Sequence, residues 1–401
     1  MLKKMMVSWL ALIALILSGC YQPKQAVFGP NVITKQNGNL IYLNPHEPRE
    51  QGQVCNVSAT QDPDNYPNSI LFLNFPGPLN CRRGDTTMYI NSEYMIPESW
   101  PFQSHDHLFI VDTSNTIRWF FELPEQYLSM QDPEWSNHPN YISFLCEAEG
   151  ASYYGYVAKI SNKDTLSLYA GGLKETSDPF IWVQPTDSID TSTWSGAVNP
   201  NLTTFDKVKN YFNTTHVKFV YLNEPPGLGY RAIYCADFRH VQNGKPEVFQ
   251  MERPTGDLSG WNIEAPIVSP NGRWVAYQLR LGADIFKAYI QELKPGSKPI
   301  FIADGGEPHF WEREDGTLYI VYTDNAGEVY STIDLLSIPR GSIGQTYLQE
   351  VRLFTSGPPS LRFSKIGEPV VVCPYPMKGG MSKDGTMVGT GYDIPYIWVI
   401  D

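Results

Sequence analysis

Short segments in which apolar and polar residues alternate follow one another along most of the chain. In Tyr141–Leu145 the even and odd positions separate into two faces, as they do in a strand that packs on one or both sides. Polar turns, several of them Asn-Gly or Asp-Gly, precede such segments, and these dipeptides accept the positive φ angles of tight reversals. Seven units of this kind are QNGNLIYL (36–43), SHDHLFIV (104–111), HPNYISFL (138–145), TTHVKFVYL (214–222), PNGRWVAYQ (270–278), EDGTLYIVY (314–322) and KDGTMVGTG (383–391).

These repeated turn-and-strand units predict an all-β fold, a single β-propeller of four-stranded blades. Seven units suggest seven blades, with six or eight as alternatives. Only two short helices are expected, around Glu125–Met130 and Thr204–Phe212. Composition agrees with many strands and turns, since the chain has 24 Tyr, 19 Phe, 32 Gly and 32 Pro. The last strand, at 396–401, is expected to pair with the first, so that early residues complete the last blade.

The most regular blade is predicted from Asn262 to Asp304. An apolar entry strand leads into Ser269-Pro270-Asn271-Gly272, and three further strands follow. This turn resembles the Ser-Pro-Asp-Gly-like turn of the TolB-type propeller family, with Asn in place of the usual Asp. The resemblance covers roughly residues 262–401 and implies a TolB-like or WD40-like β-propeller.

The amino-terminal segment combines Lys3 and Lys4 with the apolar run 7–17. That run is too short to span a bilayer, which needs about 20 apolar residues, and a basic head before a short apolar core is typical of an export signal. Leu17-Ser18-Gly19-Cys20 resembles the lipobox of bacterial lipoproteins. The predicted organisation is a signal peptide over 1–19, a lipidated tether over 20–27 and the propeller over 28–401.

The lipobox resemblance implies cleavage after Gly19 and acylation of Cys20, which would hold the protein at a lipid bilayer. An ordinary signal peptide with an incidental cysteine is the alternative. Tyr21 stands where an Asp would retain a lipoprotein in the inner membrane, so the resemblance favours the outer membrane in a host with two membranes. The predicted location is therefore the bacterial cell envelope.

Removal of residues 1–19 changes the net charge from −12 to −14, because 28 basic residues then face 42 acidic ones. Such a chain repels polyanions, so a nucleic-acid partner is not expected. Among the remaining cysteines, Cys55 and Cys81 lie in turn-rich segments and form a candidate disulfide. Cys146 and Cys235 lie inside apolar strands and are expected to behave as small buried groups.

Candidate chemistry is sparse. Asp304, Glu307 and His309 lie where the innermost strand of a blade should begin, and they are a candidate binding site at the mouth of the central channel. The His105-Asp106-His107 spacing could place two imidazoles on one face, but a third ligand is missing, and an exposed polar turn is the preferred interpretation. The sequence contains no nucleophile elbow, phosphate-binding loop or zinc motif, so catalytic residues, cofactors and metals are not predicted.

The predicted function is a noncatalytic binding platform in the cell envelope that presents one propeller face to a protein or glycan partner. The alternative is a carbohydrate-active hydrolase or lyase of the envelope that uses carboxylates in the propeller channel. The sequence by itself does not identify such a carboxylate pair among 42 acidic residues.

Overall fold

The structure of the protein is a computed structural model. The structure describes residues 31–35, 38–42, 54–62, 64–67, 69–74, 107–112, 117–149, 152–169, 177–184, 196–224, 229–282, 285–312, 318–324, 329–332, 348–350, 361–362, 371–372, 380–381, 387–390 and 395–399. The predicted lipobox, Cys20 and the tether over 20–27 lie outside these residues.

Antiparallel sheets follow one another along the chain, and in most of them neighbours in sequence are neighbours in space. Sheet B contains β3 (Val54–Ala59), β4 (Ser69–Asn74), β5 (His107–Asp112) and β6 (Ile117–Glu122). Sheet C contains β7 (Ser129–Trp135), β8 (Tyr141–Ala148), β9 (Ser152–Lys159) and β10 (Thr165–Tyr169). Both sheets are four-stranded meanders, as the alternating pattern predicted.

The next sheets repeat this plan. Sheet D contains β11 (Ser177–Val183), β13 (Val217–Asn223), β14 (Ala232–Gln242) and β15 (Lys245–Gln250), with the short β12 (Ala197–Val198) added at its edge. Sheet E contains β16 (Trp261–Val268), β17 (Trp274–Leu281), β18 (Ile285–Glu292) and β19 (Ile300–Ala303). Sheet F contains β20 (Gly305–Glu312), β21 (Leu318–Asp324), β22 (Val329–Thr332) and β23 (Leu348–Glu350). Sheet E confirms the four strands predicted between Asn262 and Asp304.

Sheet A joins the two ends of the chain. Its strands are β1 (Asn31–Lys35), β2 (Gly38–Tyr42), β26 (Gly380–Met381), β27 (Met387–Thr390) and β28 (Pro395–Val399). β2 pairs with β28 in antiparallel register, with Ile41 opposite Ile397. A further two-stranded pair, β24 (Leu361–Arg362) with β25 (Val371–Val372), lies against β27. Sheet A therefore combines the first two strands of the chain with its last three.

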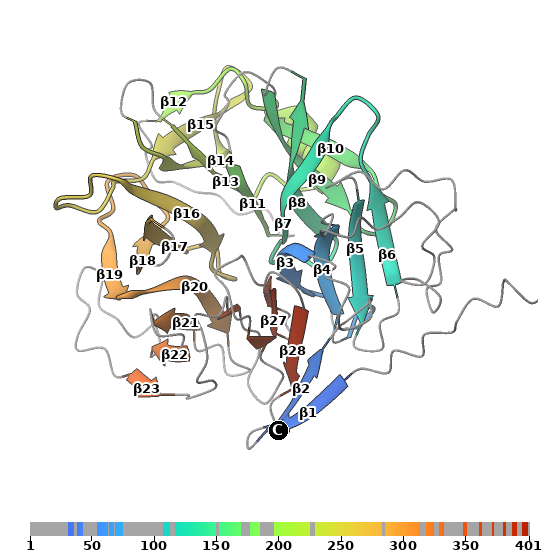
Figure 1. The fold of residues 1–401 in the computed structure, drawn as a ribbon. Coiled ribbons are helices and arrows are strands. Elements are labelled where there is room, and N and C mark those ends of the chain that lie inside the picture. The colour runs from blue at the N-terminus through green and yellow to red at the C-terminus, as the bar shows by residue number, and fades with distance from the viewer. Residues whose placement is uncertain are drawn as a thin grey trace, which may run out of the picture.

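The sheets are arranged around a common centre, like the blades of a propeller (Figure 1). The first strands of successive sheets contact one another in the order β3, β7, β11, β16 and β20. The last strands, among them β6, β10, β19 and β23, lie toward the outside (Figure 1). Sheets B to F are therefore oriented with their first strands innermost, whereas sheet A contacts β3 through β26 and β27.

The seven turn-and-strand units all contain strands, but they do not correspond to seven sheets. The first unit forms β2 and the last forms β27, and both belong to sheet A. The unit at 104–111 forms β5, which is the third strand of sheet B. The units in sheets C to F form the second strand of their sheet instead. A local pattern identifies a strand, but only strand pairing reveals which strands share a sheet, so the number of blades stays a prediction.

One helix prediction is confirmed and the other is wrong. The helix α2 (Phe205–Phe212) forms where it was expected, and it buries Val208 and Phe212. Residues 125–128 instead form a turn and loop that lead into β7, which begins at Ser129 and pairs with β8. The edge pairing of β7 with β8 overrides the local helical preference of this short segment. No helix in the described part of the chain is both long enough and apolar enough to cross a membrane.

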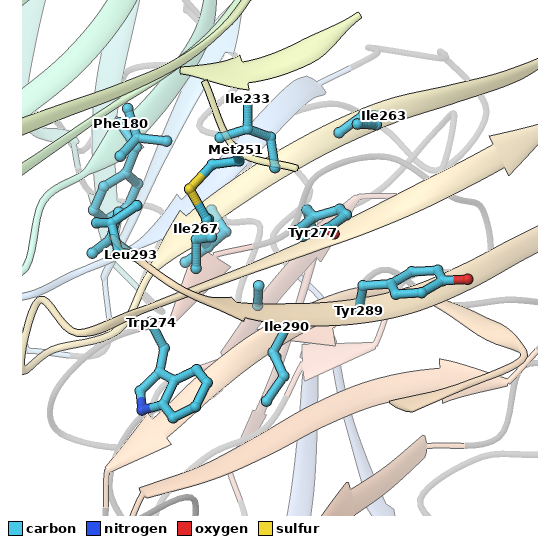
Figure 2. Packing of buried hydrophobic residues seen from close by; sticks show 14 of the residues in the cluster. Phe180, Ile233, Met251, Ile263, Ile267, Trp274, Tyr277, Tyr289, Ile290 and Leu293 are labelled. Carbon is cyan, nitrogen blue, oxygen red and sulfur yellow. The ribbon is translucent and has the colours of Figure 1, made fainter. Parts of the chain in front are cut away.

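Among the described residues, the largest core lies between sheets D and E and continues to sheet F. Figure 2 shows Phe180 and Ile233 of sheet D facing Ile267 of sheet E, with Met251 between them. Ile290 and Trp274 extend this cluster on the sheet E side (Figure 2). Sheet D thus buries one face against sheet E and the other against sheet C, which explains why β11 and β13 are buried at every position.

The turn that resembles the TolB-type motif joins sheet E to sheet D. Gly272 adopts a φ of +69°, and the ring of Trp182 lies so close that an added Cβ atom would be 2.5 Å from it. The indole nitrogen of Trp182 donates a hydrogen bond of 2.9 Å to the carbonyl of Pro270. The buried Lys218 donates to the carbonyl of Gly272. Glycine is therefore required here by both backbone conformation and space.

The described cysteines agree with the expectation for buried thiols. Cys146 and Cys235 are completely buried and free, and burial raises the pKa of both thiols. Cys55 belongs to β3, while Cys81 lies outside the described residues. The Cys55–Cys81 disulfide stays a prediction.

Candidate functional site

The innermost strands share a β-bulge at the same place in five sheets. In each, the strand advances three residues while its neighbour advances two, which inserts one extra residue. The sequences that span the bulges are Cys55–Ser58, Gln131–Glu134, Ser177–Phe180, Glu264–Ile267 and Gly306–His309. Four of the five carry proline at the third position, where the missing N–H removes no ladder hydrogen bond.

The residue before the proline has an unusual backbone in three of these bulges. Asp132, Asp178 and Ala265 each have a φ of 50°, a region that residues other than glycine seldom occupy. The carboxylate of Asp132 accepts a long hydrogen bond of 3.4 Å from the backbone N–H of Asp178. The carboxylate of Asp178 accepts an equally long one from the N–H of Ala265. Asp132 of sheet C therefore accepts a hydrogen bond from the bulge of sheet D, and Asp178 of sheet D accepts one from the bulge of sheet E.

Charged side chains of both signs gather beside these bulges. We call Asp132, Asp178, Arg231, Glu264 and Arg280 the inner-strand polar cluster. Arg231 donates to the hydroxyl of Ser177 at 3.1 Å, and Arg280 lies 3.5 Å from a carboxylate oxygen of Glu264. The cluster brings together side chains from sheets C, D and E.

Glu264 is a member of the cluster whose titration is shifted by its surroundings. Its side chain is 25% exposed, and burial raises the pKa of the carboxyl above its usual value. Arg280 opposes this shift, Asp178 adds to it, and Gln278 donates a hydrogen bond of 3.3 Å to the second oxygen. A carboxyl in this environment keeps its proton to a higher pH and can then both donate and accept hydrogen bonds.

The cluster can therefore bind a polar ligand group through fixed partners of either charge. Asp178 is only 7% exposed, so its charge is largely removed from water, where electrostatic interactions are stronger. Burying such groups is unfavourable unless they are paired, and here Arg231 and Arg280 supply opposite charges nearby. Functional sites are common where buried titratable groups cluster in this way.

The residues predicted at the channel mouth lie on the corresponding strand of sheet F. Asp304 is exposed and directly precedes β20. Burial is the main cause that raises the pKa of Tyr289, and the charge of Asp304 adds to this shift. Glu307 is at the bulge of β20, at the position equivalent to Asp132 and Asp178. His309 is half-buried, and its Nδ1 donates to the carbonyl of Phe310 at 2.8 Å. That these residues bind a ligand stays a prediction.

Sequence reasoning missed the inner-strand polar cluster. The available signal was an acidic residue one or two positions before a proline, in Gln131-Asp132-Pro133, Ser177-Asp178-Pro179, Glu264-Ala265-Pro266 and Gly306-Glu307-Pro308. Arg231 and Arg280 had no such signal, because Arg231 directly precedes β14 and Arg280 belongs to β17, so neither lies near these prolines in the sequence. The prediction of an exposed polar turn is wrong for His107, which is buried in β5 and stacks on Phe109 with ring centres 5.8 Å apart. In the described ranges, no group of three or more His, Cys, Asp or Glu could hold a metal ion.

Comparison with known proteins finds similarity only in three-dimensional structure. No protein-family model matches the chain, and no curated protein matches it. Among solved structures, the chain is similar to TolB from Acinetobacter baumannii, with 13% identity, a TM-score of 0.38 and coverage of 74% of this chain and 60% of that one. The chain thus spans less than two thirds of the length of that protein.

Two further solved structures are similar to the chain. The β-propeller domain of Cps50 (Swd1) from Myceliophteria thermophila has 10% identity and a TM-score of 0.44, over 92% of this chain and 98% of that one. The putative TolB from Agrobacterium tumefaciens has 12% identity and a TM-score of 0.34, over 70% of this chain and 92% of that one. At these values the similarities support no inference about activity, ligand or partner.

Proposed function

We propose that this chain is a lipid-anchored protein of the bacterial cell envelope whose propeller is a noncatalytic binding platform. The observation that carries the proposal is the inner-strand polar cluster, which offers fixed charges of both signs beside the innermost strands of three neighbouring sheets. Anchoring rests on the lipobox resemblance of Leu17-Ser18-Gly19-Cys20. Acylation of Cys20 would hold the platform at the outer membrane, where a protein or glycan partner can reach it.

The partner-binding part is tested by cross-linking in intact membranes, followed by recovery of the chain with its bound partner. Asp178→Asn removes a charge from the cluster but keeps an oxygen that can accept from Ala265. The control is Asp257→Asn, since Asp257 is an exposed aspartate that likewise accepts from a backbone N–H. A partner captured by wild type and the control, but lost with Asp178→Asn, supports the platform. Equal capture by all three chains contradicts it.

Anchoring is tested independently by mass spectrometry of the chain purified from its host. The proposal requires an amino terminus at Cys20 that carries diacylglyceryl and acyl chains, and loss of membrane association in Cys20→Ser. An unmodified thiol, or a leader still attached, contradicts it.

We also propose that the sheets close into a ring of seven blades. Pairing of β2 with β28 supports closure, because it removes the exposed edges that both strands would otherwise present. Deletion of residues 31–42 is expected to lower the melting temperature, measured by circular dichroism. An unchanged melting temperature contradicts closure by these strands.

A carbohydrate-active enzyme of the envelope is the second candidate. The observation that favours it is the pair Asp178 and Glu264, in which one carboxyl has a raised pKa beside another carboxylate. Incubation with envelope polysaccharides should then release new reducing ends, and Glu264→Gln should abolish the release. Binding without turnover favours the platform.

A further inference from the structure

A cavity of about 750 Å³ opens at the junction of sheets B and C, away from the inner-strand polar cluster. One wall is the β3–β4 connection, with Asp62, Asp64 and Tyr66, together with Arg118 of β6. The other wall is made by Asn140 of the β7–β8 turn and by the β9–β10 turn at residues 160–161. Cavities that bind small ligands are typically about 300–1,000 Å³, so this one is large enough for such a group.

The sheet B wall is held in shape by its own hydrogen bonds. The two carboxylate oxygens of Asp62 accept from the side chain of Asn65 at 2.9 and 3.1 Å, and its carbonyl accepts from the N–H of Tyr66 at 2.8 Å. The ring of Tyr66 meets Trp135 edge to face, with ring centres 5.8 Å apart. The wall is therefore formed before any ligand binds.

The sheet C wall is equally fixed. The side-chain oxygen of Asn140 accepts from the N–H of Ser161 at 2.8 Å, and its carbonyl accepts from the N–H of Ile160 at 3.0 Å. The indole of Trp119 in sheet B donates to the carbonyl of Ile160 at 2.9 Å, which joins the two walls. A ligand would therefore meet a preformed site, which reduces the ordering cost of binding.

Several polar groups of the cavity have hydrogen-bonding capacity left for a ligand. Within the described ranges, Asp64 makes no hydrogen bond or ion pair, so both of its carboxylate oxygens are available. The amide nitrogen of Asn140 and the hydroxyl of Ser161 likewise have no described partner. Acceptors and donors therefore face the same space, beside the partly exposed ring of Tyr66.

The charge of the cavity restricts the ligand. Asp62 and Asp64 contribute two negative charges, while the positive charge of Arg118 is paired with Asp112 at 2.7 Å. The remaining potential is negative, which disfavours phosphate and carboxylate groups. A neutral ligand with many hydroxyl groups and an apolar face satisfies carboxylate, amide and hydroxyl partners beside an aromatic ring.

We propose that this cavity binds a neutral carbohydrate. Asp64 and Asn140 engage its hydroxyl groups, Ser161 contributes a third hydrogen bond, and Tyr66 contacts a sugar face. The site is separate from the inner-strand polar cluster, so it does not depend on the proposed binding platform.

Isothermal titration of the purified full chain with cellohexaose, maltohexaose and chitohexaose tests the proposal. At least one of them should bind, and Asp64→Ala should weaken binding at least tenfold. Ser161→Trp, which fills the cavity from an exposed position, should abolish binding. Asp257→Ala, at an exposed aspartate of another turn, should leave the dissociation constant unchanged.

Salt dependence separates a sugar from a cation, because binding of an uncharged ligand is almost insensitive to ionic strength. Lack of binding by all three oligosaccharides overturns the proposal, as does unchanged affinity in Asp64→Ala. Tighter binding of spermidine, lost in Asp64→Ala and weakened by salt, overturns it in favour of a cation site. Asp178→Asn should leave oligosaccharide binding intact, so failure here is distinguishable from failure of the platform.

Discussion

Gly272 provides the sharpest test of how sheets D and E are joined. Gly272→Ala introduces two costs: a side chain at a φ of +69°, and a Cβ atom 2.5 Å from the ring of Trp182. The first costs about 1–2 kcal/mol and the second, as overpacking, about 1–3 kcal/mol. Trp182 is 2% exposed and bonded to Pro270 of the same turn, so its ring cannot move away freely. The expected total is about 2–5 kcal/mol.

Gly296→Ala is the matched control. Gly296 has the same φ of +69°, but nothing lies within 4 Å of the position that its Cβ atom would occupy. It should therefore cost only the backbone term, about 1–2 kcal/mol. Urea unfolding of the full chain, followed by fluorescence, gives both free energies from the midpoints and slopes.

The difference between the two variants isolates the contact with Trp182. It should be about 1–3 kcal/mol and should shrink when Gly272→Ala is combined with Trp182→Leu, which removes the ring that clashes. Equal costs for Gly272→Ala and Gly296→Ala would refute the reasoning. They would mean that the turn does not pack against sheet D as described.

Three further predictions concern the cluster, the sheet junctions and the thiols. Burial raises the pKa of Glu264, so the folded state holds the proton of this carboxyl more tightly than the unfolded state does. The stability that this proton contributes is lost as pH rises from the ordinary carboxyl pKa through the raised one. Urea midpoints of Glu264→Gln should therefore improve relative to wild type across that rise; a constant difference would contradict the shift. Asn137 makes two hydrogen bonds of 2.8 Å with the backbone of Val183, one to its carbonyl and one from its N–H. Asn137→Ala should therefore lower the free energy of unfolding by about 1–3 kcal/mol for each buried group left unpaired, measured by the same assay. A loss below about 0.5 kcal/mol would argue against this junction. Cys146 and Cys235 should react with a thiol reagent only in denaturant, because burial raises their pKa and blocks access; reaction of these thiols in buffer, located by peptide mapping, would show that the core opens.

The sequence by itself determined the local elements. Alternation at Tyr141–Leu145 becomes β8, and the glycine at 272 marks the turn between β16 and β17. The short amphipathic segment at 204–212 becomes α2, and Cys146 and Cys235 are buried as their apolar neighbours required. These features are encoded within a few residues, since side-chain periodicity and turn conformation act locally.

Only the tertiary structure decided which strands share a sheet and which charges meet. Residues 125–130 have helical character, yet pairing with β8 makes the last two part of strand β7 and leaves the others as a turn and loop. β2 and β28 lie far apart in the chain but adjacent in sheet A. Asp132, Asp178 and Glu264 come together because equivalent bulges on successive innermost strands face a common centre, and that proximity depends on how whole sheets pack, which no short stretch of sequence contains.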